Sequence, residues 1–242
     1  MKTKRELSRF WQWTGRVVLG TAVVLFTLAS LAGVAKANSI TYDLTQDNCT
    51  GGCNPGSSSM GTILLTDVGT NDVQVTITLI DPLEFVHGGI GATIGFNLSG
   101  IGTGVTAVNF SNSNFALASG TADSIHMDGF KDFDYGIDLT TGNGASHAVD
   151  ASPLTFDITC ASCGLTIGSF AELSTGPGSN PAYFALDVYN SSPANGNTGA
   201  IGAVDPGTPG TVVPEAGTIS LLGTGLLGLF GLAFYRRRST AV

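Results

Sequence analysis

The richest polar run of the chain, DGFKDFDYGID, extends from Asp128 to Asp138. Calcium prefers carboxylate oxygens, so Asp128, Asp132 and Asp134 are candidate ligands. On an extended strand Asp132, Asp134 and Asp138 would share one face, with carboxylates two residues apart separated by about 7 Å. That spacing is too wide for one ion without a bend or further ligands, and the run lacks the pattern of a helix-flanked calcium loop. We favour a solvated acidic face, with a weak calcium site as the alternative.

Four cysteines occur as two close pairs, Cys49 with Cys53 and Cys160 with Cys163. In an exported protein this usage favours disulfides. The short spacings favour one bond within each pair, each closing a small loop. The alternative is a zinc site built from all four thiolates, since both spacings occur in zinc proteins. A thioredoxin-like role for Cys160 and Cys163 has less support, because that motif works at a helix N-terminus and this one follows a predicted strand.

Other catalytic patterns are scarce. His87, His126 and His147 are the only imidazoles, and their spacing matches no metal-binding motif. The sequence has no GxSxG nucleophile elbow. A pair of carboxylates for glycoside hydrolysis needs only spatial proximity, so it stays open at this stage. We predict a protein that is not an enzyme and that carries no cofactor.

The N-terminus has the layout of an export signal. Five basic residues precede an apolar stretch over residues 17–34: Lys2, Lys4, Arg5, Arg9 and Arg16. Ala35 and Ala37 then form a small-x-small site, so we predict a signal peptide over residues 1–37 that signal peptidase removes before Asn38. Because the apolar run is long, an uncleaved N-terminal anchor is the alternative.

The C-terminus has the layout of a membrane segment. Residues 217–235 carry no charge, and as a helix they would span about 28 Å, close to the thickness of the hydrocarbon core. Arg236, Arg237 and Arg238 follow directly, and such cationic flanks tend to stay on the cytoplasmic side. We therefore predict a transmembrane helix over residues 217–235.

The charges are divided sharply along the chain. Of the 10 basic residues, six precede Asn38 and three follow Tyr235. Lys131 is the only basic residue between positions 38 and 213, against 16 acidic residues, which gives this part a net charge of −15. Such a body repels phosphates and anionic lipid head groups, so we exclude nucleic acid as a partner.

Val213, Pro214 and Glu215, followed by the apolar span and the cluster of Arg236, Arg237 and Arg238, resemble the PEP-CTERM sorting signal of bacterial surface proteins. Ala216 stands where that family usually has proline. The resemblance implies processing by an exosortase, a membrane-embedded cysteine protease, and delivery to the cell surface or extracellular matrix of a Gram-negative bacterium. It also implies an exopolysaccharide as a further candidate partner. An unprocessed single-span tail anchor is the alternative.

Between the two ends, two-residue alternation of apolar side chains predicts short strands. The strongest candidates are residues 73–79, 90–98, 133–139, 154–160 and 184–188, with shorter ones near 40–44, 63–66 and 105–110. A single helical turn is expected at residues 170–173. We predict an all-β domain, an antiparallel β-sandwich or jelly roll over residues 38–204, joined by a Pro/Gly-rich linker at 205–213 to the sorting tail at 214–242.

These features predict an exported surface or extracellular-matrix protein with a structural or adhesive, non-catalytic role. One alternative is a carbohydrate- or calcium-binding module. The other is a secreted glycoside hydrolase or lyase, which would need two carboxylates facing each other across a cleft.

Overall fold

The computed structural model describes residues 38–54, 56–89, 91–118, 121–176, 180–192 and 196–210, all within one compact unit. The predicted signal peptide with Ala35 and Ala37 lies outside these residues. So do the sorting tail, its predicted transmembrane helix over 217–235, and Val213, Pro214, Glu215, Arg236, Arg237 and Arg238. Within the described part of the chain, no helix is long and apolar enough to cross a membrane.

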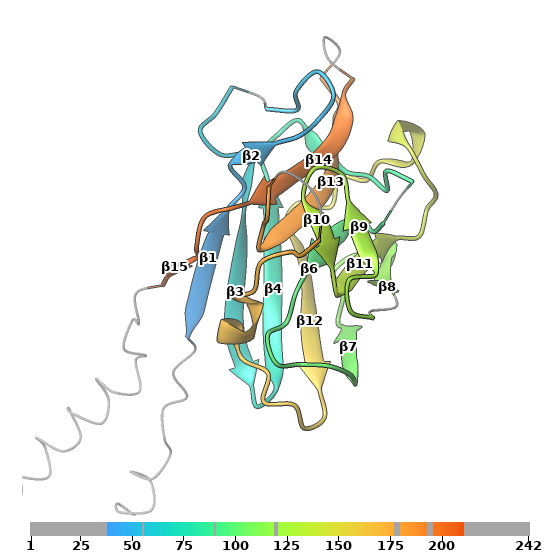
Figure 1. Ribbon diagram of the computed structural model, residues 1–242. Helices are drawn as coiled ribbons and strands as arrows, with labels where there is room; N and C mark the ends of the chain where they lie inside the picture. The colour runs from blue at the N-terminus through green and yellow to red at the C-terminus, as the bar shows by residue number, and fades with distance from the viewer. Residues whose placement is uncertain are drawn as a thin grey trace, which may run out of the picture. The chain divides into compact units, whose positions relative to one another are not determined.

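Two antiparallel sheets make up most of the domain (Figure 1). Sheet A has six strands in the order β15-β1-β3-β4-β12-β7. Their bounds are β15 Thr208–Pro209, β1 Ser39–Asp43, β3 Gly61–Gly69, β4 Asp72–Leu79, β12 Leu154–Cys160 and β7 Val105–Val108. Sheet B has seven strands, in the order β2-β14-β13-β6-β11-β8 with β5 paired to β13. Their bounds are β2 Gln46–Asp47, β14 Thr198–Ala203, β13 Phe184–Asn190, β6 Ile94–Phe96, β11 Tyr135–Leu139, β8 Phe115–Ala118 and β5 Leu83–Phe85.

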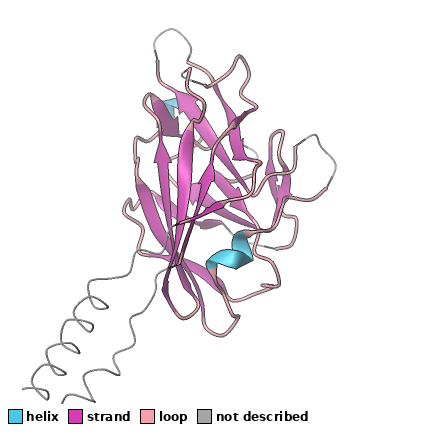
Figure 2. Cartoon of the chain, turned by 90° about the vertical axis from the view of Figure 1, so that its left-hand side faces the viewer, coloured by secondary structure: helices cyan, strands magenta, loops and turns pink. Residues whose placement is uncertain are grey.

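The main core lies between the two sheets, because one side of each strand is apolar. In β4, for example, Val73, Val75 and Ile77 are buried while Gln74 and Thr76 face outward and are only half-buried. Sheet B contributes Phe96 and Phe184, whose ring centroids lie 6.2 Å apart. The predicted all-β antiparallel architecture is confirmed, and it has the two-sheet form of a sandwich. Figure 2 shows the strands from the side, with only short helical turns between them.

A second, smaller core covers the outer face of sheet B. The hairpin of β9 (Ile125–Met127) and β10 (Lys131–Phe133) packs Met127, Phe130 and Phe133 onto that face. The sheet accepts them because its outward residues there are small. A Cβ atom on Gly95 would lie 2.8 Å from Phe133 Cδ2, and a Cβ on Gly202 would collide with Phe130. The central part of sheet B is therefore covered on both faces.

Two of the predicted strands, 133–139 and 90–98, differ from the strands in the structure. The predicted strand 133–139 is divided at Asp134, whose N–H donates to Asn97 Oδ1 (2.7 Å), so residues before and after it belong to different sheets. The predicted strand 90–98 is shorter and is regular only over β6, Ile94–Phe96. Its flanking residues Ala92 and Leu98 are buried in different cores.

Two further segments differ from the sequence prediction. Part of the expected linker 205–213 is attached to sheet A, because Thr208 and Pro209 pair with Thr41 and Ile40 of β1. The expected helical turn at 170–173 is a 3₁₀ turn at Ile167–Phe170 instead. It begins earlier because Thr166 and Ser169 form a capping box at its N-terminus.

Candidate functional site

The two predicted disulfides are present. Cys49 is bonded to Cys53 and Cys160 to Cys163, with Cα–Cα distances of 5.5 and 6.0 Å. Since both bonds form within the close pairs, the four thiols do not assemble into the alternative zinc site.

The first disulfide loop folds around the carboxylate of Asp47. The backbone N–H groups of Cys49, Cys53 and Asn54 donate to its two oxygens at 2.8–2.9 Å. Asp47, Cys49 and Cys53 are the one group of three His, Cys, Asp or Glu residues in the described chain whose ligand atoms all lie within 4.8 Å of one another. Because both sulfurs are in the disulfide and the carboxylate is held by amides, we assign this group a structural role.

The calcium candidates are not brought together. Asp128 is exposed in the turn of the β9–β10 hairpin. On β10, Asp132 Oδ1 lies 2.7 Å from His126 Nδ1 across the hairpin. Asp134 Oδ1 accepts the backbone N–H of Asp123 at 2.8 Å. Because each carboxylate has a different surrounding, the three do not form a common cation site. These three aspartates also do not form the single acidic strand face that the sequence predicts, because the strand is interrupted at Asp134.

A buried acid that the sequence analysis did not single out lies on the outer face of sheet B. Asp187 of β13 is only 6% exposed, and its Oδ2 accepts the backbone N–H of Gly88 at 2.8 Å. The pKa of Asp187 is raised to about 7, mainly by burial; the Gly88 hydrogen bond acts to lower it and the Asp128 carboxylate to raise it. A titratable group held near neutral pH by its surroundings is a candidate functional residue.

A second polar pair lies on the same face. Nδ1 of His87 approaches Oδ1 of Asp138 on β11 to 3.3 Å, but neither atom has a partner with hydrogen-bond geometry in the described chain. Burial raises the pKa of Asp138, and His87 acts in the opposite direction. Thr93 lies between the two acids in the sheet. Its carbonyl accepts the N–H of Asp187, and its hydroxyl accepts the N–H of Leu139.

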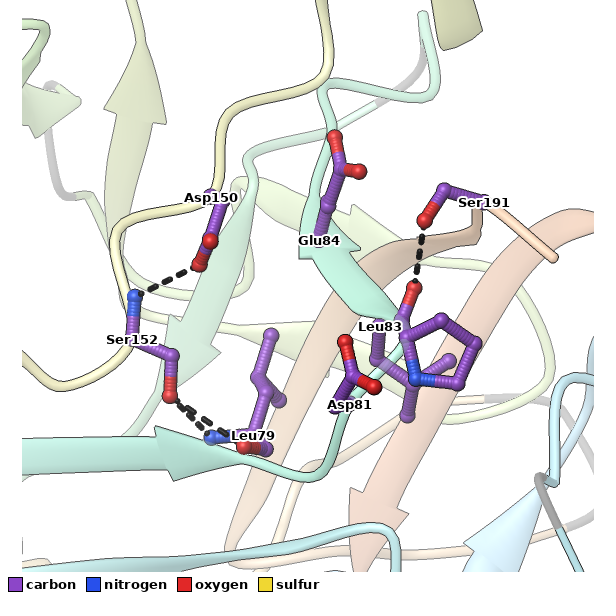
Figure 3. Close-up of a pocket in the computed structure, with 8 residues that line it drawn as sticks. Leu79, Asp81, Leu83, Glu84, Asp150, Ser152 and Ser191 are labelled. Atoms are coloured by element: carbon purple, nitrogen blue, oxygen red, sulfur yellow. Dashed lines mark hydrogen bonds between the residues drawn. The ribbon is translucent and has the colours of Figure 1, made fainter.

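A polar pocket of about 230 Å³ lies beside β5, away from these acids (Figure 3). Its lining residues are Leu79, Asp81, Pro82, Leu83, Glu84, Asp150, Ser152 and Ser191. The hydroxyl of Ser191 donates to the carbonyl of Pro82 (2.9 Å), and that of Ser152 to the carbonyl of Leu79 (3.2 Å). Figure 3 shows the three carboxylates at separate places around the pocket. The oxygens of these three carboxylates do not all lie within 4.8 Å of one another, so they do not form a preformed cation-binding site.

The structure shows an antiparallel β-sandwich that contains two disulfides. No protein-family model, curated protein or solved structure matches the chain.

The sequence contains only a weak indication that Asp187 is buried. Asp187 alternates with Phe184, Leu186 and Val188, so it is expected on a solvated outer face. The small residues Ala185, Ala200 and Gly202 on the same two strands indicate that something packs against that face. The covering hairpin belongs to a distant part of the sequence, and its position follows only from the tertiary structure.

Proposed function

We propose that this chain is an exported β-sandwich protein of the bacterial cell surface or extracellular matrix, sorted by its C-terminal tail and structural or adhesive in role. The observation that carries the proposal is the order of segments after Gly210. Pro214 and Glu215 are followed by an uncharged stretch over residues 216–235, and then by three arginines. In this proposal signal peptidase removes residues 1–37, and an exosortase-type protease processes the tail.

Three features of the domain support this proposal. Both disulfides are formed, as suits an oxidising compartment. The described part contains one basic residue, Lys131, so the cations that hold a chain at the inner side of a membrane are confined to its ends. The N–H of Gly210 donates to the carbonyl of Ser39 (2.8 Å), so the domain begins and ends at the same edge of sheet A.

The placement of carboxylates favours this role over glycoside hydrolysis. Asp187 and Asp138 lie on strands separated by β6, about 10 Å apart by strand spacing, which is near the separation that inverting hydrolases use. Asp187 is 94% buried, however, and cannot reach a polymeric substrate. The pocket acids Asp81, Glu84 and Asp150 lie at separate places around the polar pocket (Figure 3) and are not gathered within 4.8 Å of one another.

Mass spectrometry of the native protein recovered from the cell surface tests the proposal. We expect a mature N-terminus at Asn38, a C-terminus shortened near Pro214, and four cysteines that resist alkylation before reduction. A chain that retains Met1, fractionates with the cytosol and carries free thiols would refute export and every role built on it.

A further inference from the structure

The outer face of sheet A carries a regular array of threonines. Its outward positions in β1, β3, β4 and β12 hold seven of them: Thr41, Thr62, Thr66, Thr76, Thr78, Thr155 and Thr159. The strand register places Thr41, Leu64, Thr76 and Thr155 in one row across four strands. Neighbours in such a row lie about 4.8 Å apart, and rows repeat about every 6.8 Å along the strands. We call the first six of these threonines, together with Leu64, the threonine face.

Among the described residues, the hydroxyl groups of the threonine face have no protein partner. None of the hydrogen bonds between described residues involves the Oγ1 atom of any of the six. The seventh threonine differs, because Thr159 Oγ1 lies 2.7 Å from Thr106 Oγ1 on the neighbouring strand β7. The six side chains are half-buried or exposed, so each hydroxyl can both donate and accept a bond with a partner at the surface.

The distribution of charge on the threonine face limits which kinds of partner can bind there. The central row has no ionisable residue, while the acids lie at the borders, with Asp43 at one corner and Asp72 and Asp157 on the opposite side. Asp157 is already held by Gln74 Nε2 (3.3 Å) and Asn109 Nδ2 (2.7 Å). With 16 acids against one base in the body, an anionic polymer or a second copy of this chain would be repelled.

The shape and composition of the threonine face further limit the class of partner that can bind there. A protein partner usually needs buried aromatic or arginine anchors, and the threonine face has neither, with Leu64 at 37% exposure as its one large apolar side chain. A rigid crystalline surface is a poor match, because adjacent strands are rotated by about 20–25°. A flexible, uncharged chain of hydroxyl groups fits all of these constraints.

We propose that the threonine face docks an uncharged polysaccharide, whose hydroxyls bond to the threonine hydroxyls and whose C–H faces contact the threonine methyls and Leu64. This proposal rests on the surface or matrix role proposed above and names the partner of the domain. Each contact is weak, so binding depends on several contacts along one polymer chain.

Affinity electrophoresis tests the proposal. The full chain in a polyoxyethylene detergent, which has no sugar head group, is run at pH 8 in native gels that contain dextran, hydroxyethyl cellulose, galactomannan or, as the anionic comparison, alginate. The test variant is Thr41→Val/Thr76→Val/Thr155→Val, which removes three hydroxyls of the central row and keeps shape and charge. The matched control is Thr198→Val on β14, an exposed strand threonine of sheet B.

We expect at least one neutral polymer to retard the wild-type chain and the Thr198→Val control equally, and alginate to retard neither. The triple variant should lose at least about tenfold in association constant, while its mobility in a polymer-free gel and its melting temperature stay unchanged. Retardation that survives in the triple variant, equal retardation by alginate, no retardation by any neutral polymer, or self-association through this face would each overturn the proposal. The mature termini are measured separately, so a failure here leaves the sorting proposal standing.

Discussion

Replacing Asp187 with Asn should remove a pH dependence of stability that the structure places in this one carboxyl. The folded pKa of about 7 lies above the ordinary 3.8, so the folded state keeps a proton that the unfolded chain releases between about pH 4 and pH 7. The contribution of Asp187 to the free energy of unfolding is therefore most favourable below about pH 4. It declines as pH rises to about 7 and is constant above that.

The magnitude follows from the size of the shift. About three pKa units correspond to about 4 kcal/mol of stability lost across that window. Asparagine cannot ionise, and its Oδ1 can still accept the N–H of Gly88. We therefore expect Asp187→Asn to match the wild type within about 1 kcal/mol at pH 4. At pH 8 the variant should be more stable, by up to about 4 kcal/mol.

Urea unfolding of the full chain at half-unit steps from pH 4 to pH 8 measures this, with Asp43→Asn on β1 as an exposed control. The control should keep the wild-type slope, because Asp43 is exposed in the folded state. If Asp187→Asn keeps the wild-type slope, or is less stable than wild type at pH 8, then burial of this carboxyl is not what sets the pH dependence.

Three further predictions concern the hairpin, the disulfides and the acidic run. Gly95→Ala should lower the free energy of unfolding by about 1–3 kcal/mol, because its Cβ would press on Phe133 and on Met127 Cγ at 3.0 Å; Gly102→Ala, with nothing within 4 Å, is the matched control in the same urea assay. Cys49→Ser/Cys53→Ser should cost about 2 kcal/mol through loss of a small closed loop, and a cost no larger than that of an exposed serine substitution would show that the bond does not constrain the chain. Calorimetric titration with calcium should give no binding heat, and chelator should leave the melting temperature unchanged, because Asp128, Asp132 and Asp134 do not share a site; a saturable heat that Asp132→Asn abolishes would contradict this.

Much of the architecture follows from local pattern. Apolar alternation along Val73, Val75 and Ile77 locates a strand and its buried side, because side chains of a strand alternate between its two faces. Spacing also favours the disulfides that form, since bonds within the pairs Cys49–Cys53 and Cys160–Cys163 close the shortest loops. The segregation of basic residues to the two ends is likewise a property of the sequence.

The tertiary structure decides what covers each face. Asp187 and Thr76 both occupy outward positions of alternating strands, yet Asp187 is buried beneath a distant part of the chain while the outer side of Thr76 stays accessible. The difference arises because Gly95 and Gly202 leave room on sheet B for Phe130 and Phe133, whereas β-branched side chains fill the outer side of sheet A. Periodicity assigns a residue to a side of its own strand, but burial depends on which other segment packs there, and that contact joins residues far apart in the sequence.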